Sequence, residues 1–328
     1  MFNQPVNKIL VIRFSSLGDV LLTTPILRAL KQKFPSAQID FLVRPKYSDV
    51  LKFNTGISNL INFETDLTAK IKYDLRIANY DLIIDLQNNY RSRKLLHGLQ
   101  PKIYRFDKPT FKKLLLVWTK INLLKDIKTI CQRYAETANV QLDEKGLDLI
   151  IPEKITSILD IRKNYVGICP GAKHFTKRWP AEYFIQLGNQ ITDFGFTIVI
   201  FGGKDDIDVC TEISSKIKNS INLCNNDQIL QTAVDMKLCK LIICNDSGLM
   251  HTASAIGIPL IVLFGSTVKE FGFIPFKVNN LILENKMLSC RPCSHIGKSN
   301  CPQKHFKCMV DLKPQIVYEH SQQFLKGL

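Results

Sequence analysis

Short apolar runs alternate with helical patterns in the first part of the chain. Residues 8–13 form a β-rich run, and residues 19–34 follow with apolar positions at helical spacing. Two further runs, residues 38–43 and 80–86, predict two more strands. Strands that alternate with helices favour a parallel sheet covered on both faces. The first part of the chain is therefore predicted to be an α/β domain.

The same alternation restarts near residue 165. It predicts strands at residues 165–169, 196–201, 241–244 and 259–264, separated by helices at residues 180–194, 205–218 and 248–256. The polar and poorly periodic segment 141–163 between the two patterns is typical of a linker. We expect two doubly wound, Rossmann-like domains, residues 1–155 and 156–328, that face each other across a ligand-binding cleft. A final helix near residues 314–326 could pack back on the first domain.

Length and composition agree with this division. A chain of 328 residues is too long for one ordinary hydrophobic core. The longest apolar runs, such as residues 259–264, are far shorter than the roughly 20 residues that cross a bilayer. The N-terminus lacks the apolar block and cleavage site of a signal peptide. We therefore expect a cytoplasmic protein, in which six scattered cysteines of the ten are buried and reduced.

The formal net charge of +15 is unevenly distributed. Residues 91–133 contain twelve Lys and Arg against two acids, Asp107 and Asp126, an excess of ten positive charges. Such a stretch indicates an anionic partner, either nucleic acid, anionic lipid or a phosphorylated glycolipid, although a plain solvated surface also fits. No nucleic-acid-binding motif accompanies it. Within it, residues 110–124 have the pattern of an amphipathic helix with lysines, which suits a membrane surface or an ordinary core-facing helix.

The first motif, residues 13–20 (RFSSLGDV), directly follows the first strand. Gly18 allows a tight turn, after which a helix N-terminus faces the expected cleft. Asp19 at this place has two possible roles, because it could cap the helix or act as a general base. The motif has a single glycine, which counts against the G-x-G-x-x-G dinucleotide site of a nicotinamide dehydrogenase.

Two further motifs follow strands of the second domain. In residues 169–180 (CPGAKHFTKRWP), Gly171 permits close backbone approach and Lys177 supplies positive charge for a diphosphate. In residues 245–253 (NDSGLMHTA), Ser247 and Gly248 could offer N–H groups and a hydroxyl to phosphate oxygens at a helix start. Asp246 could accept hydrogen bonds from sugar hydroxyls or hold a lysine. The alternative interpretation of residues 169–180 is a solvated basic loop, and that of residues 245–253 is a helix cap that binds no ligand.

The fourth motif, residues 201–206 (FGGKDD), repeats the strand, glycine and helix arrangement. Asp206 could bind a ribose diol. Asp206 and Asp208 also match the D-x-D pattern of metal-dependent glycosyltransferases, but acids in a first helical turn are favourable without any metal.

Taken together, these motifs resemble the heptosyltransferases, family 9 of the glycosyltransferases, along nearly the whole chain. The blocks that carry the resemblance are SSLGD at residues 15–19, IIDLQNNYRSR at 83–93, PGAKHFTKRWP at 170–180, CNDSGLMHTASAIGIPLIVLFGST at 244–267, and the cysteine-rich ending. The resemblance implies the two-domain GT-B architecture and an inverting transfer of heptose from ADP-heptose to the inner core of lipopolysaccharide. The expected acceptor is a lipid A-core glycolipid at the inner-membrane surface, and neither a cofactor nor a catalytic metal is expected.

Position by position, the resemblance also implies residue roles. Asp19 matches the proposed general base. Acceptor binding is assigned to Ser16, Gly18, Arg91 and Arg93, and donor binding to Gly171, Lys177, Asp206, Asp246, Ser247, Gly248 and His251. Asp206 stands where the family usually has Glu. This departure keeps open an alternative, a GT-B transferase or epimerase that uses another nucleotide sugar in cell-envelope glycan synthesis.

The C-terminal cysteines Cys290, Cys293, Cys301 and Cys308 form a separate cluster in the sequence. Together with His295 and His305 they could build a structural zinc site. Their intervals do not match a standard zinc finger or ribbon, so reduced or partly oxidised thiols are the other interpretation.

Overall fold

The computed structural model describes residues 5–124, 128–225 and 227–326. The chain divides into two compact units, the first made of Met1–Lys108 and Lys128–Ile150, the second of Pro109–Ile127 and Ile151–Leu328. The predicted boundary near residue 155 lies close to the change at Ile150, but the second unit also takes residues 109–127 out of the predicted first domain. Lys125 and Asp126 of the basic stretch lie outside the described residues.

The first unit is built on a five-stranded parallel sheet in the order β3-β2-β1-β4-β5. Its elements are β1 (Lys8–Ile12), α1 (Leu17–Leu21), α2 (Thr24–Lys33), β2 (Gln38–Val43), the 3₁₀ helix η1 (Pro45–Tyr47), β3 (Asn59–Asn62), η2 (Thr65–Leu67), α3 (Thr68–Ile77), β4 (Leu82–Asp85), α4 (Tyr90–Leu96), β5 (Lys102–Arg105) and α6 (Ile130–Ala138). This is the doubly wound order expected for a Rossmann-like domain.

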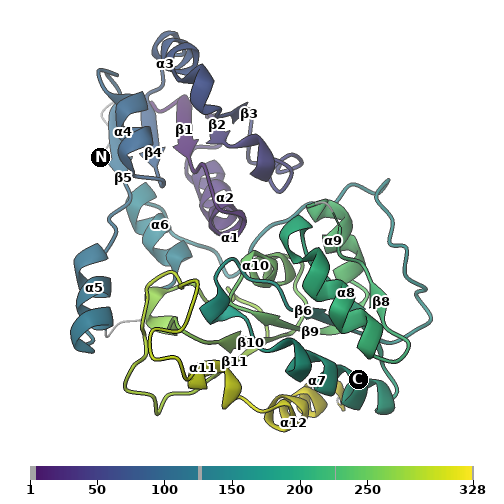
Figure 1. The fold of residues 1–328 in the computed structure, drawn as a ribbon. Coiled ribbons are helices and arrows are strands. Elements are labelled where there is room, and N and C mark those ends of the chain that lie inside the picture. The colour runs from purple at the N-terminus through teal and green to yellow at the C-terminus, as the bar shows by residue number, and fades with distance from the viewer. Residues whose placement is uncertain (1–4, 125–127, 226, 327–328) are drawn as a thin grey trace. The chain divides into compact units, whose positions relative to one another are not determined.

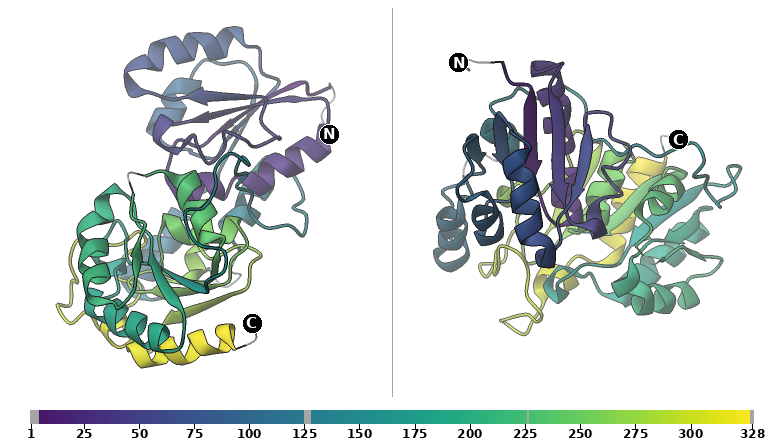
Figure 2. Two further views of the ribbon diagram at one scale, coloured as in Figure 1. Left: turned by 90° about the vertical axis from the view of Figure 1, so that its right-hand side faces the viewer. Right: turned by 90° about the horizontal axis from the view of Figure 1, so that it is seen from above.

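Helices cover both faces of this sheet (Figures 1 and 2). On one face, Leu10 and Ile12 of β1 pack with Ile71 and Leu75 of α3 and with side chains of α4. Helices α2 and α6 contact each other away from this cluster. The helix predicted over residues 19–34 is two helices, because Pro25 near the start of α2 has no N–H to donate and its ring would clash with the preceding turn.

The second unit has a six-stranded parallel sheet in the order β11-β10-β9-β6-β7-β8. Its elements are α5 (Thr110–Thr119), β6 (Tyr165–Cys169), η3 (Phe175–Lys177), α7 (Ala181–Asp193), β7 (Thr197–Ile200), η4 (Lys204–Asp206), α8 (Ile207–Lys216), β8 (Ile221–Asn222), α9 (Ile229–Met236), β9 (Cys239–Asn245), α10 (Gly248–Ala255), β10 (Leu260–Phe264), η5 (Lys269–Phe271), β11 (Asn280–Glu284), α11 (Lys307–Val310) and α12 (Pro314–Leu325). The order is again doubly wound, so the predicted fold class is confirmed for both units.

Alternate residues of each strand face opposite helical layers in this unit. Helices α7, α8 and α12 pack on one face, where Ile168 and Ile243 lie, and α9 and α10 pack on the other, where Cys169 and Cys244 lie. Helix α12 contacts α7 and β9 and belongs to the second unit.

Helix α5 is joined to the second unit although its sequence lies between elements of the first. Leu116 of α5 is buried with Leu124 and Phe271. The Lys120 ammonium, just past the helix end, donates to the carbonyl oxygens of Cys290 at 3.1 Å and Pro292 at 2.8 Å. An apolar cluster and a charged cap therefore fix α5 to the cysteine-rich segment.

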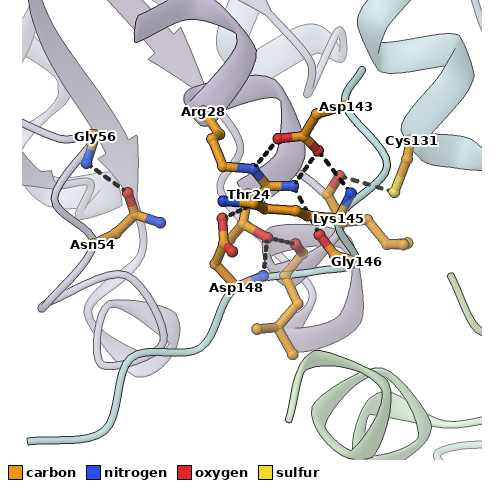
Figure 3. A network of polar contacts seen from close by, with 11 residues as sticks. Thr24, Arg28, Asn54, Gly56, Cys131, Asp143, Lys145, Gly146 and Asp148 are labelled. Atoms are coloured by element: carbon orange, nitrogen blue, oxygen red, sulfur yellow. Dashed lines mark hydrogen bonds and ion pairs between the residues drawn. The ribbon is translucent and has the colours of Figure 1, made fainter. Parts of the chain in front are cut away.

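The last residues of the first unit, which form the start of the predicted linker, are tied to α2 by a polar network (Figure 3). Arg28 Nε and Nη2 donate to the two carboxylate oxygens of Asp143 at 2.6 and 2.7 Å, and Nη1 pairs with Asp148. The Arg28 side chain also donates to the Gly146 carbonyl, and the Thr24 hydroxyl accepts the Asp148 N–H at 2.8 Å. The predicted linker, residues 141–163, is thus fastened to the first unit over its first third.

No helix in the described part of the chain is long and apolar enough to cross a membrane.

Candidate active site

The strand order reverses once in each sheet, between β1 and β4 in the first unit and between β6 and β9 in the second. Ligands of doubly wound sheets bind at such switch points, beyond the carboxyl ends of the strands. In the register, Ile12 is paired with Asp85 and Cys169 with Cys244, so the strands of each pair end at a similar level. The motifs predicted from the sequence directly follow three of these four strands, β1, β6 and β9.

Asp19 is the third residue of α1, and Ser16 is the N-cap of this helix. The Asp19 Oδ2 accepts hydrogen bonds from the Ser16 N–H at 3.2 Å and from its hydroxyl at 2.9 Å, while Oδ1 lies 2.6 Å from Arg13 Nη2. The suggestion that Asp19 is the N-cap was therefore wrong in position, although Asp19 does stabilise the helix start through the capping box. Gly18 lies buried beside it, and the catalytic role of Asp19 stays a prediction.

Arg13 is the buried partner of Asp19. Its Nε donates to the Ser15 carbonyl at 2.8 Å and its Nη1 to the Leu86 carbonyl at 2.9 Å. Burial acts to lower the pKa of Arg13, but the neighbouring Asp19 carboxylate outweighs it and the pKa is raised. The guanidinium therefore stays charged and holds the Asp19 carboxylate in one orientation.

Lys108 is a further candidate residue that the sequence analysis missed. Its ammonium donates to the carbonyl oxygens of Gln87 at 2.6 Å and Asn88 at 3.0 Å, just beyond β4. Burial, together with the nearby charge of Arg13, lowers the pKa of Lys108. Its position three residues after β5 is the only sequence signal that could have indicated it.

The two predicted acceptor arginines lie on α4 and are exposed. Arg93 Nε donates to the Asn88 side chain at 2.9 Å, which brings Arg93 to the turn that Lys108 also contacts. Arg91 lies two residues earlier on the surface of the same helix. The structure therefore groups Arg93 with the turn after β4, and Arg91 is placed only by its helix.

In the second unit, the structure brings Lys177 and Asp246 together. The Lys177 ammonium lies 2.6 Å from Asp246 Oδ2, and the side chains are only 16% and 8% exposed. The Thr267 hydroxyl donates to the same oxygen at 2.7 Å. Asp246 therefore fixes the ammonium at the carboxyl end of β9 and occupies one of its three donors, so two N–H groups can bind a ligand anion. Thr267 was not predicted, because it lies 21 residues beyond Asp246 in the sequence.

Ser247 is the N-cap of α10, and Gly248 is the first helical residue. The Ser247 hydroxyl is buried and has no hydrogen-bond partner in the described structure. Such a group is costly unless a ligand or water satisfies it. His251 lies buried in the first half of α10. A helix start with this unsatisfied hydroxyl, next to a fixed ammonium, is suited to an anionic ligand.

Asp206 lies at the end of η4, and its carboxyl group is beside Gly171. A Cβ at Gly171 would collide with the Asp206 carboxyl group, so only glycine allows this approach. Asp206 Oδ2 accepts the Gly203 N–H at 3.1 Å. Burial raises the pKa of Asp206, and the Gly203 hydrogen bond and the Arg178 charge oppose this. Its carboxyl group is thus held near the backbone at the end of β6.

The loop that carries Lys177 is braced by the cysteine-rich segment. The Thr176 hydroxyl donates to the Ser266 hydroxyl at 2.9 Å and accepts the Lys298 N–H at 2.8 Å. Arg291 is a second brace, because its buried guanidinium donates to the carbonyl oxygens of Gly265 and Thr267 at 2.6 and 2.8 Å. The segment therefore supports both Lys177 and Thr267, a role that the sequence did not predict.

The four clustered cysteines are free thiols, and Cys290 Sγ lies 3.8 Å from His305 Nε2. Burial raises the pKa of Cys293, and it raises the pKa of Cys308 to about 12. Among the described residues, no group of three or more His, Cys, Asp or Glu side chains is arranged to hold a metal ion. The zinc site that the sequence allowed is therefore not preformed in the described residues.

Two Rossmann-like sheets, each with its motifs at the switch point, define the GT-B class of glycosyltransferases. The whole chain superposes on the solved structure of a family 9 glycosyltransferase from Veillonella parvula with a TM-score of 0.81 and 21% identity, covering 100% of this chain and 99% of that one. It also matches the structure of ADP-heptose LPS heptosyltransferase II from Escherichia coli with a TM-score of 0.78 and 24% identity, covering 98% and 99% of the two chains. At these identities the likeness shows the fold.

The sequence comparison shows the family. Residues 68–304 match glycosyltransferase family 9 (heptosyltransferase). Lipooligosaccharide heptosyltransferase 2 of Campylobacter jejuni is 31% identical over 323 residues, which cover 95% of this chain and 96% of the relative. The chain belongs to glycosyltransferase family 9, the heptosyltransferases, and is a transferase. The resemblance drawn from its motifs is thereby confirmed.

Proposed function

We propose that the protein transfers heptose from ADP-heptose to the inner core of lipopolysaccharide, with inversion at the anomeric carbon. Relatives that match nearly the whole chain are named as lipopolysaccharide or lipooligosaccharide heptosyltransferases 2. The observation that carries the proposal is the 2.6 Å pair of Lys177 and Asp246 beside the unsatisfied Ser247 hydroxyl at the start of α10. This combination offers a cation, a hydroxyl donor and a helix dipole to one diphosphate.

The donor is held by the second unit in this proposal. Lys177, Ser247 and the Gly248 N–H bind the diphosphate, and Asp206, next to Gly171, accepts hydrogen bonds from the ribose. Asp246 orients Lys177 and accepts from a heptose hydroxyl through its remaining lone pairs. As the bond to the anomeric carbon breaks, negative charge grows on the diphosphate. The fixed ammonium and helix start stabilise this charge without a reorganisation step.

Asp19 activates the acceptor in the same scheme. Its carboxylate removes the proton from the attacking hydroxyl as that oxygen bonds to the anomeric carbon. Arg13 orients the carboxylate, since its Nη2 lies 2.6 Å from Oδ1. Ser16 and Gly18 lie beyond the end of β1, and Arg93 and Lys108 contact the turn beyond the neighbouring strand β4. A cationic edge of this kind suits an acceptor that carries carboxylates or phosphates.

The acceptor is a lipid A-core glycolipid, so we place the reaction on the cytoplasmic side, at the inner-membrane surface. The support is electrostatic. Residues 91–133 carry twelve Lys and Arg against two acids, and each Lys or Arg near an anionic leaflet contributes about 1 kcal/mol to binding. Residence at this surface would be peripheral.

The test is a transfer assay with the purified protein, ADP-heptose and core glycolipid from a strain that lacks the corresponding heptose, followed by mass spectrometry of the product. We expect one heptose to be added, in excess EDTA as well, because side chains rather than a metal stabilise the leaving group. Lys177→Ala should weaken ADP binding by roughly 1.5–3 kcal/mol, as a lost charge-assisted hydrogen bond does.

Activity with UDP-sugars and none with ADP-heptose would overturn the donor assignment and favour the transferase or epimerase that uses another nucleotide. Activity lost in EDTA and restored by magnesium or manganese would overturn the metal-free scheme. Calorimetry with ADP and UDP distinguishes a protein that binds UDP in place of ADP from an inactive preparation that binds neither nucleotide.

A further inference from the structure

Helix α5 is apolar on two opposite faces. On the inner face, Leu116 and Val117 pack with Phe271 and Phe273. On the outer face, Phe111, Leu115 and Trp118 are spaced i, i+4 and i+7 and so form one stripe. Phe111 is 74% exposed and Trp118 is 75% exposed. An aromatic stripe left in solvent next to a well-packed inner face calls for a partner.

The charges around this stripe are of one sign. Residues 109–124 contain three lysines and no acid. Lys112 is exposed, whereas the Lys113 ammonium lies over the rings of Phe271 and Phe273 and Lys120 donates to the carbonyl oxygens of Cys290 and Pro292. Helix α3 is a useful contrast, because Tyr73 and Ile77 are also exposed, at 64% and 59%, and are spaced i, i+4. Residues 64–77 around them contain three acids and three bases, a net charge of zero. Exposed aromatic side chains beside a segment with an excess of positive charge are thus found on α5 and not on α3.

We propose that the outer face of α5 docks on an anionic lipid bilayer, with Phe111 and Trp118 inserted at the level of the headgroups and Lys112 contacting lipid phosphates. Lysine is depleted at protein–protein interfaces, whereas tryptophan beside lysine is typical of helices that lie in the membrane interface. The stripe alone would suit another protein equally well. The exposed Lys112 and the absence of acids from the segment decide in favour of lipid.

This inference deepens the proposed membrane residence and rests on it, because it names the element that makes the contact. It also changes which part of the protein is anchored. Helix α5 belongs to the second unit, which carries Lys177 and Asp246, through Leu116 and the Lys120 contacts to Cys290 and Pro292. The lipid contact is therefore carried by the unit with the donor motifs and not by the unit with Asp19.

The two tryptophans of the chain make the docking directly observable. Trp179 is only 2% exposed, whereas Trp118 lies in solvent. Vesicles of phosphatidylglycerol should therefore shift the emission of Trp118 to the blue and protect it from a soluble quencher, and brominated lipid should quench it. Vesicles of phosphatidylcholine should have a much smaller effect, and added salt should weaken the effect of phosphatidylglycerol.

Sedimentation with the same vesicles tests the energetics. The double variant Phe111→Ser, Trp118→Ser should lose at least about tenfold in vesicle affinity, since two aromatic side chains no longer leave water. The matched control is Tyr73→Ser, Ile77→Ser on α3, which should bind vesicles like the parent. Unchanged ADP affinity of both variants shows that they are folded.

Three outcomes would overturn the proposal. One is equal vesicle binding by the α5 variant and the parent, and another is equal loss in the α3 control. The third is a concentration-dependent blue shift without vesicles, accompanied by dimers in the ultracentrifuge, which would make a second copy the occupant of the stripe. Transfer to a water-soluble, deacylated acceptor should be the same in all three proteins. If the parent protein transfers no heptose to this acceptor, the proposed function is refuted, but the result on vesicle binding is unaffected.

Discussion

The Asp19 carboxylate stabilises the start of α1, and the proposed mechanism uses the same carboxylate as the general base. Ser16 donates twice to Oδ2, and Arg13 holds Oδ1 at 2.6 Å. These contacts are all that a purely structural role of Asp19 requires. Catalysis requires in addition that the carboxylate accept a proton, which an amide does not do.

The variant Asp19→Asn separates the two roles. Its side-chain oxygen can still accept the Ser16 N–H, but the buried Arg13 guanidinium loses its carboxylate partner, so the thermal stability should fall. Turnover should fall about 10²- to 10⁴-fold, the range for loss of a general base. ADP affinity, measured by calorimetry, should stay unchanged because the donor residues belong to the other unit. A turnover close to that of the parent would leave Asp19 with the capping role only.

Ser247 permits a similar separation of stability from binding. Its buried hydroxyl has no hydrogen-bond partner in the described structure, so Ser247→Ala removes a group that costs free energy in the unliganded protein. The melting temperature should stay the same or rise. ADP affinity should fall roughly threefold to tenfold, as for one neutral hydrogen bond. A lower melting temperature with unchanged ADP affinity would place the hydroxyl in the fold rather than in the donor site.

The sequence predicted the site residues that lie in motifs, but not the residues that contact and orient them. Asp19, Lys177 and Asp246 were found because each follows a strand within a short signature. Arg13 lies inside the first signature but was not recognised as the ion-pair partner of Asp19. Thr267 and Arg291 act through contacts made across more than 20 residues of sequence, and such contacts leave no local pattern.

At the scale of elements, the buried strands were the most predictable. Residues 38–43 and 165–169 are strands with the predicted bounds, since both strands are almost entirely buried. The strands β3, β5, β8 and β11 were missed. These four are the edge strands of the two sheets, and the polar residues at their exposed positions interrupt the apolar run that predicts a strand.

The start of the linker is another element whose structure depends on distant contacts. Asp143 lies in a polar and poorly periodic segment, and Arg28 of α2 binds both of its carboxylate oxygens. The hydrogen bonds from Arg28 are the largest cause that lowers the pKa of Asp143. An acid with a lowered pKa stabilises the fold above its unfolded pKa of about 3.9, and the contribution is lost as the pH falls through the folded value.

We therefore expect Asp143→Asn to destabilise the protein by about 1 kcal/mol at pH 7, the upper range for partly exposed ion pairs. The difference from the parent should shrink below about pH 4. Thermal unfolding of both proteins over a pH series measures it. Arg28→Lys keeps the charge but loses the planar fork, so it should be destabilised at pH 7 to a similar extent. A difference that stays constant from pH 7 to pH 3 would mean that the ion pair contributes nothing.

On the scale of the whole molecule, the chain passes between the two units three times, at Lys108–Pro109, Ile127–Lys128 and Ile150–Ile151. The basic stretch was expected to lie in one domain. It is instead divided, with Arg91, Arg93 and Lys108 in the first unit and Lys112, Lys113 and Lys120 in the second. We therefore expect two separate electrostatic roles, one for the charges of the first unit, which also contains Asp19, and one for the charges of α5.

Two charge reversals distinguish these roles. Arg91→Glu with Arg93→Glu acts on α4, where Arg93 contacts the turn that Lys108 also holds, and should raise the acceptor KM with little change in vesicle binding. Lys112→Glu acts on the exposed side of α5 and should weaken vesicle binding. Each reversal near an anionic surface changes the local charge by two, and one charge contributes about 1 kcal/mol there. Donor KM should stay the same for both variants.

Salt provides the check on the electrostatic cause. Exposed charges are screened beyond about 8 Å at physiological ionic strength, so raising the salt concentration in the parent protein should reproduce both effects together. In the α4 variant, the acceptor KM should respond less to salt than in the parent, and in the α5 variant the same should hold for vesicle affinity. If each variant instead impaired acceptor KM and vesicle binding to the same degree, the two groups of charges would act as one surface, and the division of the basic stretch between the units would have no functional consequence.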